Sequence, residues 1–287
     1  MWFRVFVFLT LGISLSATEF RCLLEKDQEY ALIRMTDSKV RLLLVNTNTL
    51  QTKTSIRTKS MMFRKCQKNS RYENLKKELL ARPFKVANRG MVEGSQKGYA
   101  VTVDMCPSSK KGFELEFFKA LIQKQKGCPV TISMTKKWAI HHPKEFAMLK
   151  AWDDEKKLTI TWMNHGTMHP YAPHVPLEKN FINLEGIDFK KEVLENESFL
   201  IKEGRVPSIF YRFAGLVSNE KAFNYLVKDL GLIPVGSLAW LAKGEMIKNG
   251  SIVLLHGNKN EPLGIKRFLE VKTTLPVVNL PQLFIKD

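Results

Sequence analysis

The sequence predicts an α/β barrel, in which parallel strands form a ring surrounded by helices. Short apolar, β-branched runs bounded by turn residues recur in its later part, as at residues 99–105 and 251–255. Such runs are typical of strands that are covered on both faces. Segments with apolar residues at helical spacing alternate with them, as in α/β folds. Several runs also end in a charged or imidazole side chain, as expected where the C-terminal ends of barrel strands meet at one site.

The first 17 residues have the composition of a secretory signal peptide. One arginine at position 4 precedes an apolar core at residues 5–13, and small residues at 14–17 offer a cleavage point. The core is too short to favour a membrane span, and no other stretch approaches that length. We therefore expect a secreted or periplasmic protein with no transmembrane span in its mature form.

A small β-rich extension is expected before the barrel. Residues 30–35 and 40–45 have the period-two pattern of strands and are bounded by Asp-Ser and Asn-Thr turns. Residues 72–81 have a helical pattern that stops before Pro83. The predicted organisation is residues 1–17 as signal peptide, 18–84 as a partly β N-terminal extension with one helix, and 85–287 as the barrel.

Strands and helices alternate along the predicted barrel. Residues 85–98 are expected to form a linker or the first barrel strand, and the clear alternation starts at residue 99. Glycine at position 127 ends a helical pattern, and an apolar strand run follows it. This strand is predicted at residues 130–134. Helices are predicted at residues 113–126, 144–149, 189–201 and 220–230.

Two histidines four residues apart, His165 and His169, stand in a segment closed by Pro170. They can converge on one divalent metal if they share a helical turn or a tight strand-to-loop turn. Imidazole is a common zinc ligand, and a catalytic site adds a carboxylate and leaves one position open for water. Taken alone, such a pair is a weak signal.

Three other predicted strand ends strengthen that signal. They carry Asp104, Arg212 and His256, so a carboxylate, a guanidinium and a third imidazole would share the rim of the barrel with the histidine pair. Each of these groups alone could be a satisfied structural polar group. The ordered set favours a single catalytic site.

These segments, in order along residues 97–269, resemble the motifs of the NodB-homology polysaccharide deacetylases, carbohydrate esterases that remove N- or O-acetyl groups from sugars. Residues 102–107, Thr-Val-Asp-Met-Cys-Pro, resemble the first motif, Thr-Phe-Asp-Asp-Gly-Pro, and residues 165–170 match the second, His-Ser/Thr-x-x-His-Pro. The resemblance implies the distorted (β/α) barrel of this family. The fifth, third and fourth motifs are matched, with decreasing specificity, by Leu255-His256, Arg212 and Ala239-Trp240.

The resemblance implies a divalent metal held by His165 and His169, with Zn²⁺ expected and Co²⁺, Ni²⁺ or Fe²⁺ as alternatives. In the family the second aspartate of the first motif is a ligand, and this chain has Met105 there. A thioether is a poor partner for a hard cation. Three alternatives stay open: Asp104 is itself a ligand, Cys106 supplies a thiolate, or the metal is held weakly or not at all.

The same resemblance implies the catalytic roles. Asp104 is expected to be the general base, oriented by Arg212, and His256 the acid that protonates the departing amine. The oxyanion is expected to be held by the metal and a backbone N–H near Tyr171. Trp240, in the partial match to the fourth motif, is expected to contact the sugar together with Tyr171.

The expected function is metal-dependent removal of acetyl groups from a cell-wall or extracellular polysaccharide, with N-deacetylation first and O-acetyl esters as a variant on the same residues. Ala239 stands where the family has a carboxylate that tunes the acidic histidine, and Met105 replaces a ligand. The alternative is therefore a non-catalytic glycan-binding barrel with a degraded metal site.

Cysteines and charge add two expectations. Cys22 with Cys66 would cross-link the extension, whereas Cys106 with Cys128 would remove Cys106 as a metal ligand. The net charge of +17 favours an anionic cell-envelope polymer as a partner. The densest basic region, residues 56–77, has few aromatics and no nucleic-acid motif, so no specific nucleic-acid partner is expected.

Overall fold

The computed structural model describes residues 20–36 and 40–285. The predicted signal peptide therefore lies outside the described residues. Within them, none of the helices combines the length and the apolar character that crossing a membrane requires.

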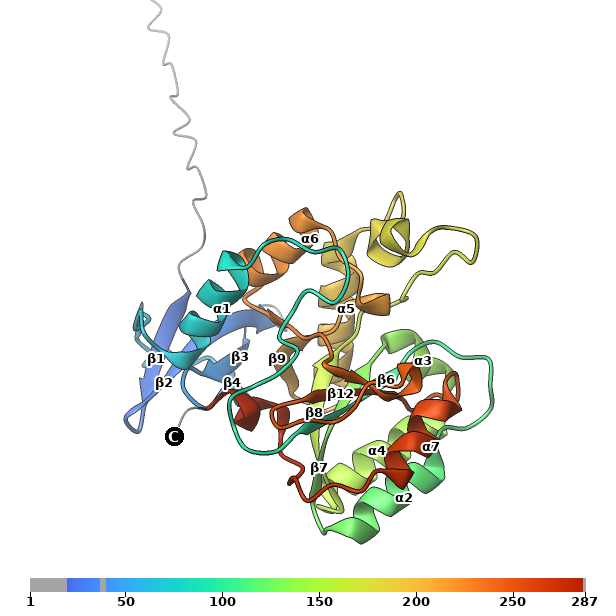
Figure 1. Cartoon of the computed structure of the whole chain (residues 1–287). Coiled ribbons are helices and arrows are strands. Elements are labelled where there is room, and N and C mark those ends of the chain that lie inside the picture. The colour runs from blue at the N-terminus through green and yellow to red at the C-terminus, as the bar shows by residue number, and fades with distance from the viewer. Residues whose placement is uncertain (1–19, 37–39, 286–287) are drawn as a thin grey trace, which may run out of the picture.

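A parallel sheet of seven strands, in the order β10-β9-β8-β7-β6-β12-β11, forms the body of the molecule. Every pair of neighbouring strands in it is parallel. The sheet curls into a half-barrel (Figure 1), which confirms the predicted distorted barrel. The strands are β6 (Ala100–Met105), β7 (Cys128–Met134), β8 (Leu158–Asn164), β9 (Pro207–Tyr211), β10 (Ile233–Pro234), β11 (Ala239–Trp240) and β12 (Ile252–His256).

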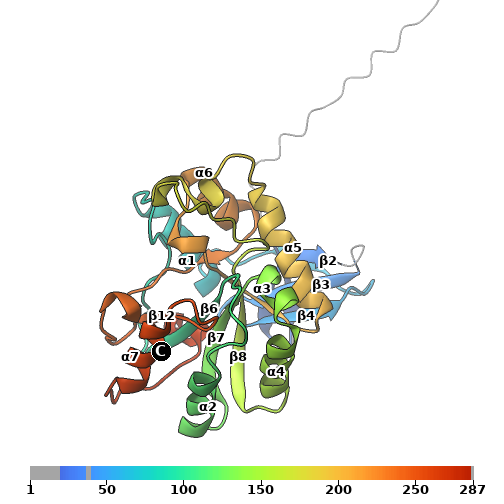
Figure 2. The same ribbon diagram turned by 90° about the vertical axis from the view of Figure 1, so that its right-hand side faces the viewer.

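Helices cover the outside of the sheet (Figure 2). The apolar faces of the helices meet the outward side chains of the central strands in one cluster, where Phe117 and Phe268 pack edge to face with ring centroids 5.5 Å apart. This packing buries the sheet on both faces, as the apolar runs predict. The helices are α2 (Leu115–Lys124), α3 (Lys136–His141), α4 (Pro143–Asp154), α5 (Phe189–Lys202), α6 (Glu220–Asn224) and α7 (Pro262–Glu270).

Two predicted elements differ in the structure. The helix expected at residues 220–230 is α-helical only over α6, because a π-helical turn at Tyr225–Asp229 follows it. Residues 85–98 contribute isolated bridges and no regular strand; Met91 pairs with Val235 and lies alongside the barrel edge. This segment is therefore the linker of the two alternatives.

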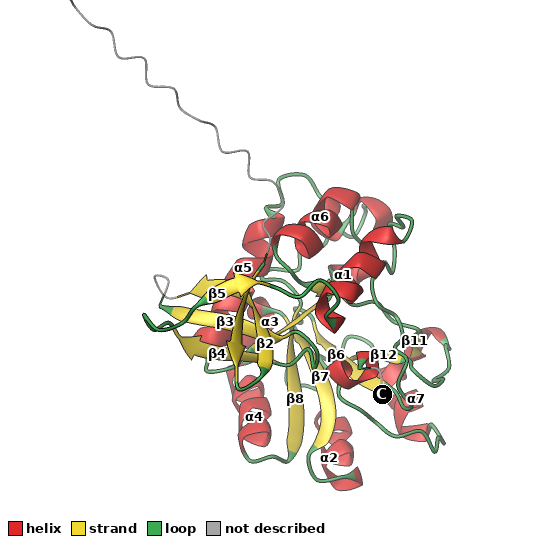
Figure 3. Cartoon of the chain, turned by 90° about the vertical axis from the view of Figure 1, so that its left-hand side faces the viewer, coloured by secondary structure: helices red, strands yellow, loops and turns green. Residues whose placement is uncertain are grey.

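The β-rich extension is an antiparallel five-stranded sheet, in the order β4-β3-β2-β1-β5, followed by one helix. Figure 3 shows this sheet beside the parallel strands of the barrel. Ser70 caps the helix by accepting a hydrogen bond from the backbone N–H of Glu73. These elements are β1 (Arg21–Glu25), β2 (Gln28–Thr36), β3 (Arg41–Asn46), β4 (Thr52–Ile56), β5 (Phe63–Lys65) and α1 (Arg71–Ala81).

Of the two proposed disulfides, Cys22–Cys66 is present, while Cys106 and Cys128 are free thiols. The second pairing was wrong for a geometric reason. The strands β6 and β7 are parallel with Thr102 opposite Thr131, so Cys128 lies level with residue 99 and Cys106 lies seven residues further along. Seven residues of strand span about 23 Å, far beyond the reach of a disulfide.

An apolar cluster joins the extension to the barrel. It contains Cys22 and Leu43 of the antiparallel sheet together with Phe210 of β9 and Leu226 after α6. The division at residues 84 and 85 stays a prediction, and this shared cluster shows that the two parts pack on one another.

Candidate active site

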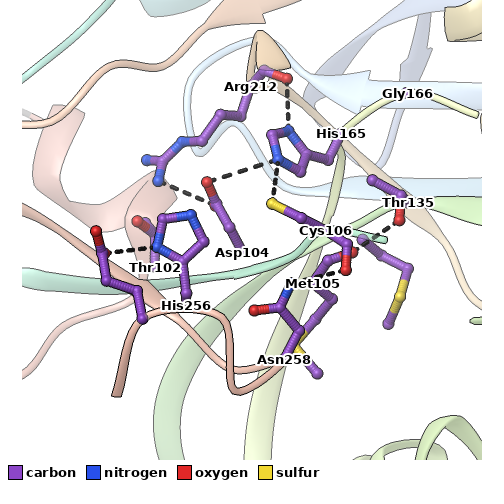
Figure 4. A network of polar contacts seen from close by, with 12 residues as sticks. Thr102, Asp104, Met105, Cys106, Thr135, His165, Gly166, Arg212, His256 and Asn258 are labelled. Atoms are coloured by element: carbon purple, nitrogen blue, oxygen red, sulfur yellow. Dashed lines mark hydrogen bonds and ion pairs between the residues drawn. The ribbon is translucent and has the colours of Figure 1, made fainter. Parts of the chain in front are cut away.

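Five of the predicted site residues meet at the C-terminal end of the parallel strands, around a cavity of about 980 Å³. They come from four different strand ends, which is how a barrel of this kind brings distant residues together. Figure 4 shows four of these five residues together with Cys106. The five are Asp104 at the end of β6, His165 and His169 after β8, Arg212 after β9 and His256 at the end of β12; Tyr171 and Trp240 line the same cavity.

Asp104 and Arg212 form a buried ion pair. The Nη1 of Arg212 donates to Oδ1 of Asp104 at 3.1 Å, and its Nη2 donates to the carbonyl of Gly236 at 3.0 Å. Burial lowers the pKa of Arg212 from its ordinary value, and the neighbouring carboxylate opposes that shift. The two bonds of Arg212 thus hold the Asp104 carboxylate in a fixed orientation at the cavity wall.

His165 turns its Nε2 into the site. Its Nδ1 lies 2.9 Å from the carbonyl oxygen of Arg212, which can only accept, so Nδ1 carries the proton. Its Nε2 lies 3.4 Å from Sγ of Cys106 and 3.6 Å from Oδ2 of Asp104. Burial alone would lower the pKa of His165, but Asp104 and Cys106 raise it above its usual value. The same two groups would favour a metal cation at this point.

His169 is presented by a strained loop. Its φ of 50° lies in the left-handed region, and its ring centroid is 4.8 Å from that of His165. The buried Nε2 of His169 has no hydrogen-bond partner among residues 20–36 and 40–285. A buried nitrogen left unpaired in this way suits a metal ligand.

Glu192 of α5 holds this loop and was missed by the sequence analysis. Its buried carboxylate accepts hydrogen bonds from the backbone N–H groups of Thr167, Met168 and His169 at 3.0, 3.0 and 3.2 Å. The sequence carries no local signal for it, because the acid lies more than twenty residues from the loop.

Cys106 lies between the histidines and the other polar groups. It is 8% exposed, and its Sγ with one nitrogen each of His165 and His169 forms a set of three ligand atoms within 4.8 Å of one another. A second such set joins Cys106 to Asp104 and His256. Burial raises the pKa of the Cys106 thiol, but His169 and His165 outweigh it and lower the pKa well below the usual range. These donors together fit a divalent metal ion.

His256 has a carboxylate partner that the sequence analysis also missed. The Nδ1 of His256 lies 2.8 Å from Oε2 of Glu261, which also accepts a hydrogen bond from Nε1 of Trp240 at 2.8 Å. Burial lowers the pKa of His256, but Cys106 and Glu261 raise it to about 10. Glu261 thus gives His256 a carboxylate partner, although position 239 is alanine. Its only sequence signal is an acid just before Pro262, where α7 begins.

Aromatic side chains line the outer part of the cavity. Tyr171 is 60% exposed, and its ring centroid lies 5.4 Å from that of Phe181, which also lines the cavity. In the same lining, Nζ of Lys243 lies 3.6 Å above the ring of Trp240. The arrangement gives a sugar ring flat apolar faces to rest on.

No protein-family model matches the chain. The structure is similar to a family 4 carbohydrate esterase from Bacillus anthracis, with a TM-score of 0.49 and 21% identity over 74% of this chain and 90% of that chain. It is also similar to a peptidoglycan N-acetylglucosamine deacetylase, with a TM-score of 0.48 and 18% identity over 69% of this chain and 92% of that one.

A third similar structure is a family 4 pseudoenzyme from Bacillus anthracis, with a TM-score of 0.48 and 10% identity over 92% of this chain and 89% of that one. These structures are of the kind that the motifs resemble.

Proposed function

We propose that the protein is a metal-dependent hydrolase that removes acetyl groups from a cell-wall or extracellular polysaccharide, with N-deacetylation as its main reaction. One observation carries the proposal: Asp104, two histidines and a carboxylate-bound third histidine all line one cavity, and the buried Arg212 donates to Asp104 from behind them. These are the groups that acyl-group hydrolysis needs, namely a base, metal ligands and an acid.

His165 and His169 would hold the metal, Zn²⁺ in the first place and Co²⁺, Ni²⁺ or Fe²⁺ otherwise. Asp104, 3.6 Å from Nε2 of His165, lies close enough to be a further ligand or to serve the water beside it. When bound, the metal would supply Lewis acidity, which acidifies water and polarises the acyl carbonyl.

Asp104 would accept the proton of the attacking water. The bond from Arg212 to Oδ1 fixes the orientation of the carboxylate and leaves Oδ2 directed at the site. Backbone N–H groups near Tyr171 would donate to the oxyanion that forms when the carbonyl is attacked.

His256 would donate a proton to the departing amine. Its pKa of about 10, raised by Cys106 and Glu261, favours the imidazolium form at neutral pH, and Glu261 fixes the ring through Nδ1, so that Nε2 is the nitrogen that would face the substrate. Trp240 and Tyr171 would carry the sugar rings on either side of the reacting group.

The setting of the reaction is part of the proposal. The predicted signal peptide would deliver the protein to the periplasm or the cell exterior, where acetylated polysaccharide is found. The net charge of +17 would hold it near an anionic envelope polymer, an attraction that salt weakens.

Acetate release tests the function. The zinc-loaded protein would be incubated with N-acetylglucosamine oligomers, peptidoglycan and an O-acetylated polysaccharide, beside a His165→Ala, His169→Ala variant. We expect acetate from at least one substrate, lost in the variant and after chelation. Full activity in the chelated protein would exclude a metal-dependent mechanism.

The second candidate is a glycan-binding barrel without turnover. It is favoured by Met105, which is fully buried in the apolar cluster where the family has a metal ligand. Tight binding of an acetylated oligosaccharide by the metal-loaded protein, with no acetate released over long incubation, would support this candidate over the enzyme.

A further inference from the structure

We propose that the thiolate of Cys106 is the third protein ligand of the metal, giving a Cys-His-His site that leaves Asp104 free to act as the base. This inference rests on the metal-dependent function proposed above. It concerns the ligand set alone, so it can be tested without any substrate.

The spacing of the donor atoms fits such a site. In tetrahedral zinc sites the metal lies about 2.3 Å from a cysteine sulfur and about 2.0–2.1 Å from a histidine nitrogen, which places the sulfur and nitrogen roughly 3.6 Å apart. Sγ of Cys106 and Nε2 of His165 are 3.4 Å apart. The nitrogen of His169 completes a set within 4.8 Å, a span that a small movement of the loop can close.

Apart from the 3.4 Å contact between Nε2 of His165 and Sγ of Cys106, the hydrogen bonds around these atoms leave the nitrogen lone pairs to the site. The Nδ1 proton of His165 is donated to a backbone carbonyl, as is common for metal-ligating histidines, so Nε2 offers its lone pair to the site. The buried Nε2 of His169 has no hydrogen-bond partner in the described part of the chain. One thiol proton cannot satisfy both nitrogens, whereas one cation can bind both nitrogens and the sulfur.

The alternation of side chains along β6 explains why residue 106, and not residue 105, would be the ligand. Met105 points into the apolar cluster between sheet and helices, against Gly257. A Cβ added at Gly257 would lie only 2.6 Å from the sulfur of Met105. Side chains alternate along a strand, so Cys106 returns to the face of Asp104. The backbone carbonyl of Cys106 accepts a hydrogen bond from Nδ2 of Asn258 at 2.7 Å, which fixes the residue after the strand has ended.

Asp104 is already paired with Arg212, and this pairing competes with binding a metal. Its Oδ1 is bound to the buried guanidinium of Arg212, and this bond withdraws charge from the carboxylate. A thiolate beside two imidazoles also selects borderline metals such as zinc and cobalt over magnesium or manganese. The proposed ligand set therefore predicts metal preference as well as spectroscopy.

Cobalt substitution tests the inference. The metal-free protein would be titrated with Co²⁺ and its absorption recorded, because a thiolate ligand adds an intense near-ultraviolet sulfur-to-cobalt charge-transfer band that nitrogen and oxygen ligands lack. We expect this band in the wild type and in Cys128→Ser, and its loss in Cys106→Ser. Cys128 is the matched control, since it is also a buried free thiol but lies at the other end of the sheet.

X-ray absorption of the zinc-loaded wild type gives the same answer without a substitution, should Cys106→Ser fail to fold. We expect a zinc–sulfur distance of about 2.3 Å. Stoichiometric metal with acetate release but only nitrogen and oxygen ligands would overturn the Cys106 assignment and leave the proposed function intact. Sulfur ligation without acetate release would support the assignment and count against the function. Failure to bind any metal would overturn both.

Discussion

At the residue scale, two histidines of the site are made different by their partners. His165 gives its Nδ1 proton to a carbonyl and shows the site a lone pair, whereas His256 binds a carboxylate through Nδ1 and is kept protonated. In our proposal the same kind of side chain therefore serves as metal ligand in one place and as acid in the other. This difference between the two histidines is the strongest support for the hypothesis that the protein is an active enzyme.

Replacing His256 by alanine should lower the rate of acetate release by about 10²–10⁴-fold, because the departing amine loses its proton donor. Metal content, measured by elemental analysis, should stay as in the wild type, since two other histidines hold the metal in our proposal. An unchanged rate would remove His256 from the mechanism.

Replacing Glu261 by glutamine should change the pH profile. Glu261 contributes to the raised pKa of His256, so the acid form persists to a higher pH than in a free imidazole and is lost above the raised pKa. Without the carboxylate the imidazolium loses a stabilising partner, so the descending limb of activity should move toward neutral pH by on the order of one pH unit or more. Trp240→Phe, which removes only the other hydrogen bond to Glu261, is the control and should keep the wild-type limb. Identical limbs in wild type and Glu261→Gln would contradict the role of Glu261.

The sequence could predict the polar groups at strand ends, because Asp104, Arg212 and His256 each follow an apolar run directly. It could not predict Glu192 or Glu261, because Glu192 lies on α5 and Glu261 immediately before α7, and both meet their partners only through the way the chain folds. It also could not choose among the metal's third ligands, since only the fold shows that Met105 points into the core.

At the element scale, the loop after β8 depends on α5. Three consecutive backbone N–H groups of the loop converge on the Glu192 carboxylate, and the loop would otherwise leave them unpaired in a buried place. The helix thus sets where His169 points, although it contributes no side chain to the cavity itself.

Glu192→Ala should weaken metal binding by roughly 10–100-fold, the usual loss when a group that orients a ligand is removed. The affinity would be measured by competition with a chromophoric chelator. Glu195→Gln on the same helix is the matched control, because that side chain makes only partly exposed ion pairs with Lys136 and Lys191. If both variants bind metal as the wild type does, α5 does not position His169.

Element types followed from pattern where the period was clear, and failed where a local detail intervened. The strand pattern at 130–134 and the helical pattern at 72–81 correspond to β7 and α1. The helix expected at 220–230 is interrupted by a π-helical turn, and apolar spacing alone does not reveal such a turn. The wrong Cys106–Cys128 pairing shows that disulfides need the strand register, which the sequence does not give.

At the scale of the whole molecule, the extension is tied to the barrel by more than apolar packing. Nε of Arg34 on β2 lies 2.9 Å from Oε1 of Glu197 on α5, and Nη1 of Arg34 donates to the carbonyl of Leu230 at 2.8 Å. Glu197 is almost fully buried. Because α5 also carries Glu192, this one helix contacts both the extension and the loop after β8.

The Arg34–Glu197 pair gives a prediction for the stability of the whole fold. Burial raises the pKa of Glu197, and Arg34 opposes that rise. Arg34→Met would leave a buried carboxylate unpaired, which costs about 3–5 kcal/mol where the group must stay charged. In the variant the folded-state pKa of Glu197 lies still further above the unfolded value, so the folded state takes up a proton more readily. The loss of stability should therefore be large at neutral pH and shrink as the pH falls toward the unfolded pKa of about 4.3.

Urea unfolding at neutral and at mildly acidic pH, followed by tryptophan fluorescence with the disulfide intact, measures this difference. The double variant Arg34→Met, Glu197→Gln is the control, because it removes the titrating group. Like the single variant, it lacks the hydrogen bond to Leu230, and the cost of losing that bond does not depend on pH. Its deficit relative to the wild type should vary less with pH than that of Arg34→Met. A deficit of Arg34→Met that stayed constant, or grew toward low pH, would show that Glu197 is not held ionised by Arg34.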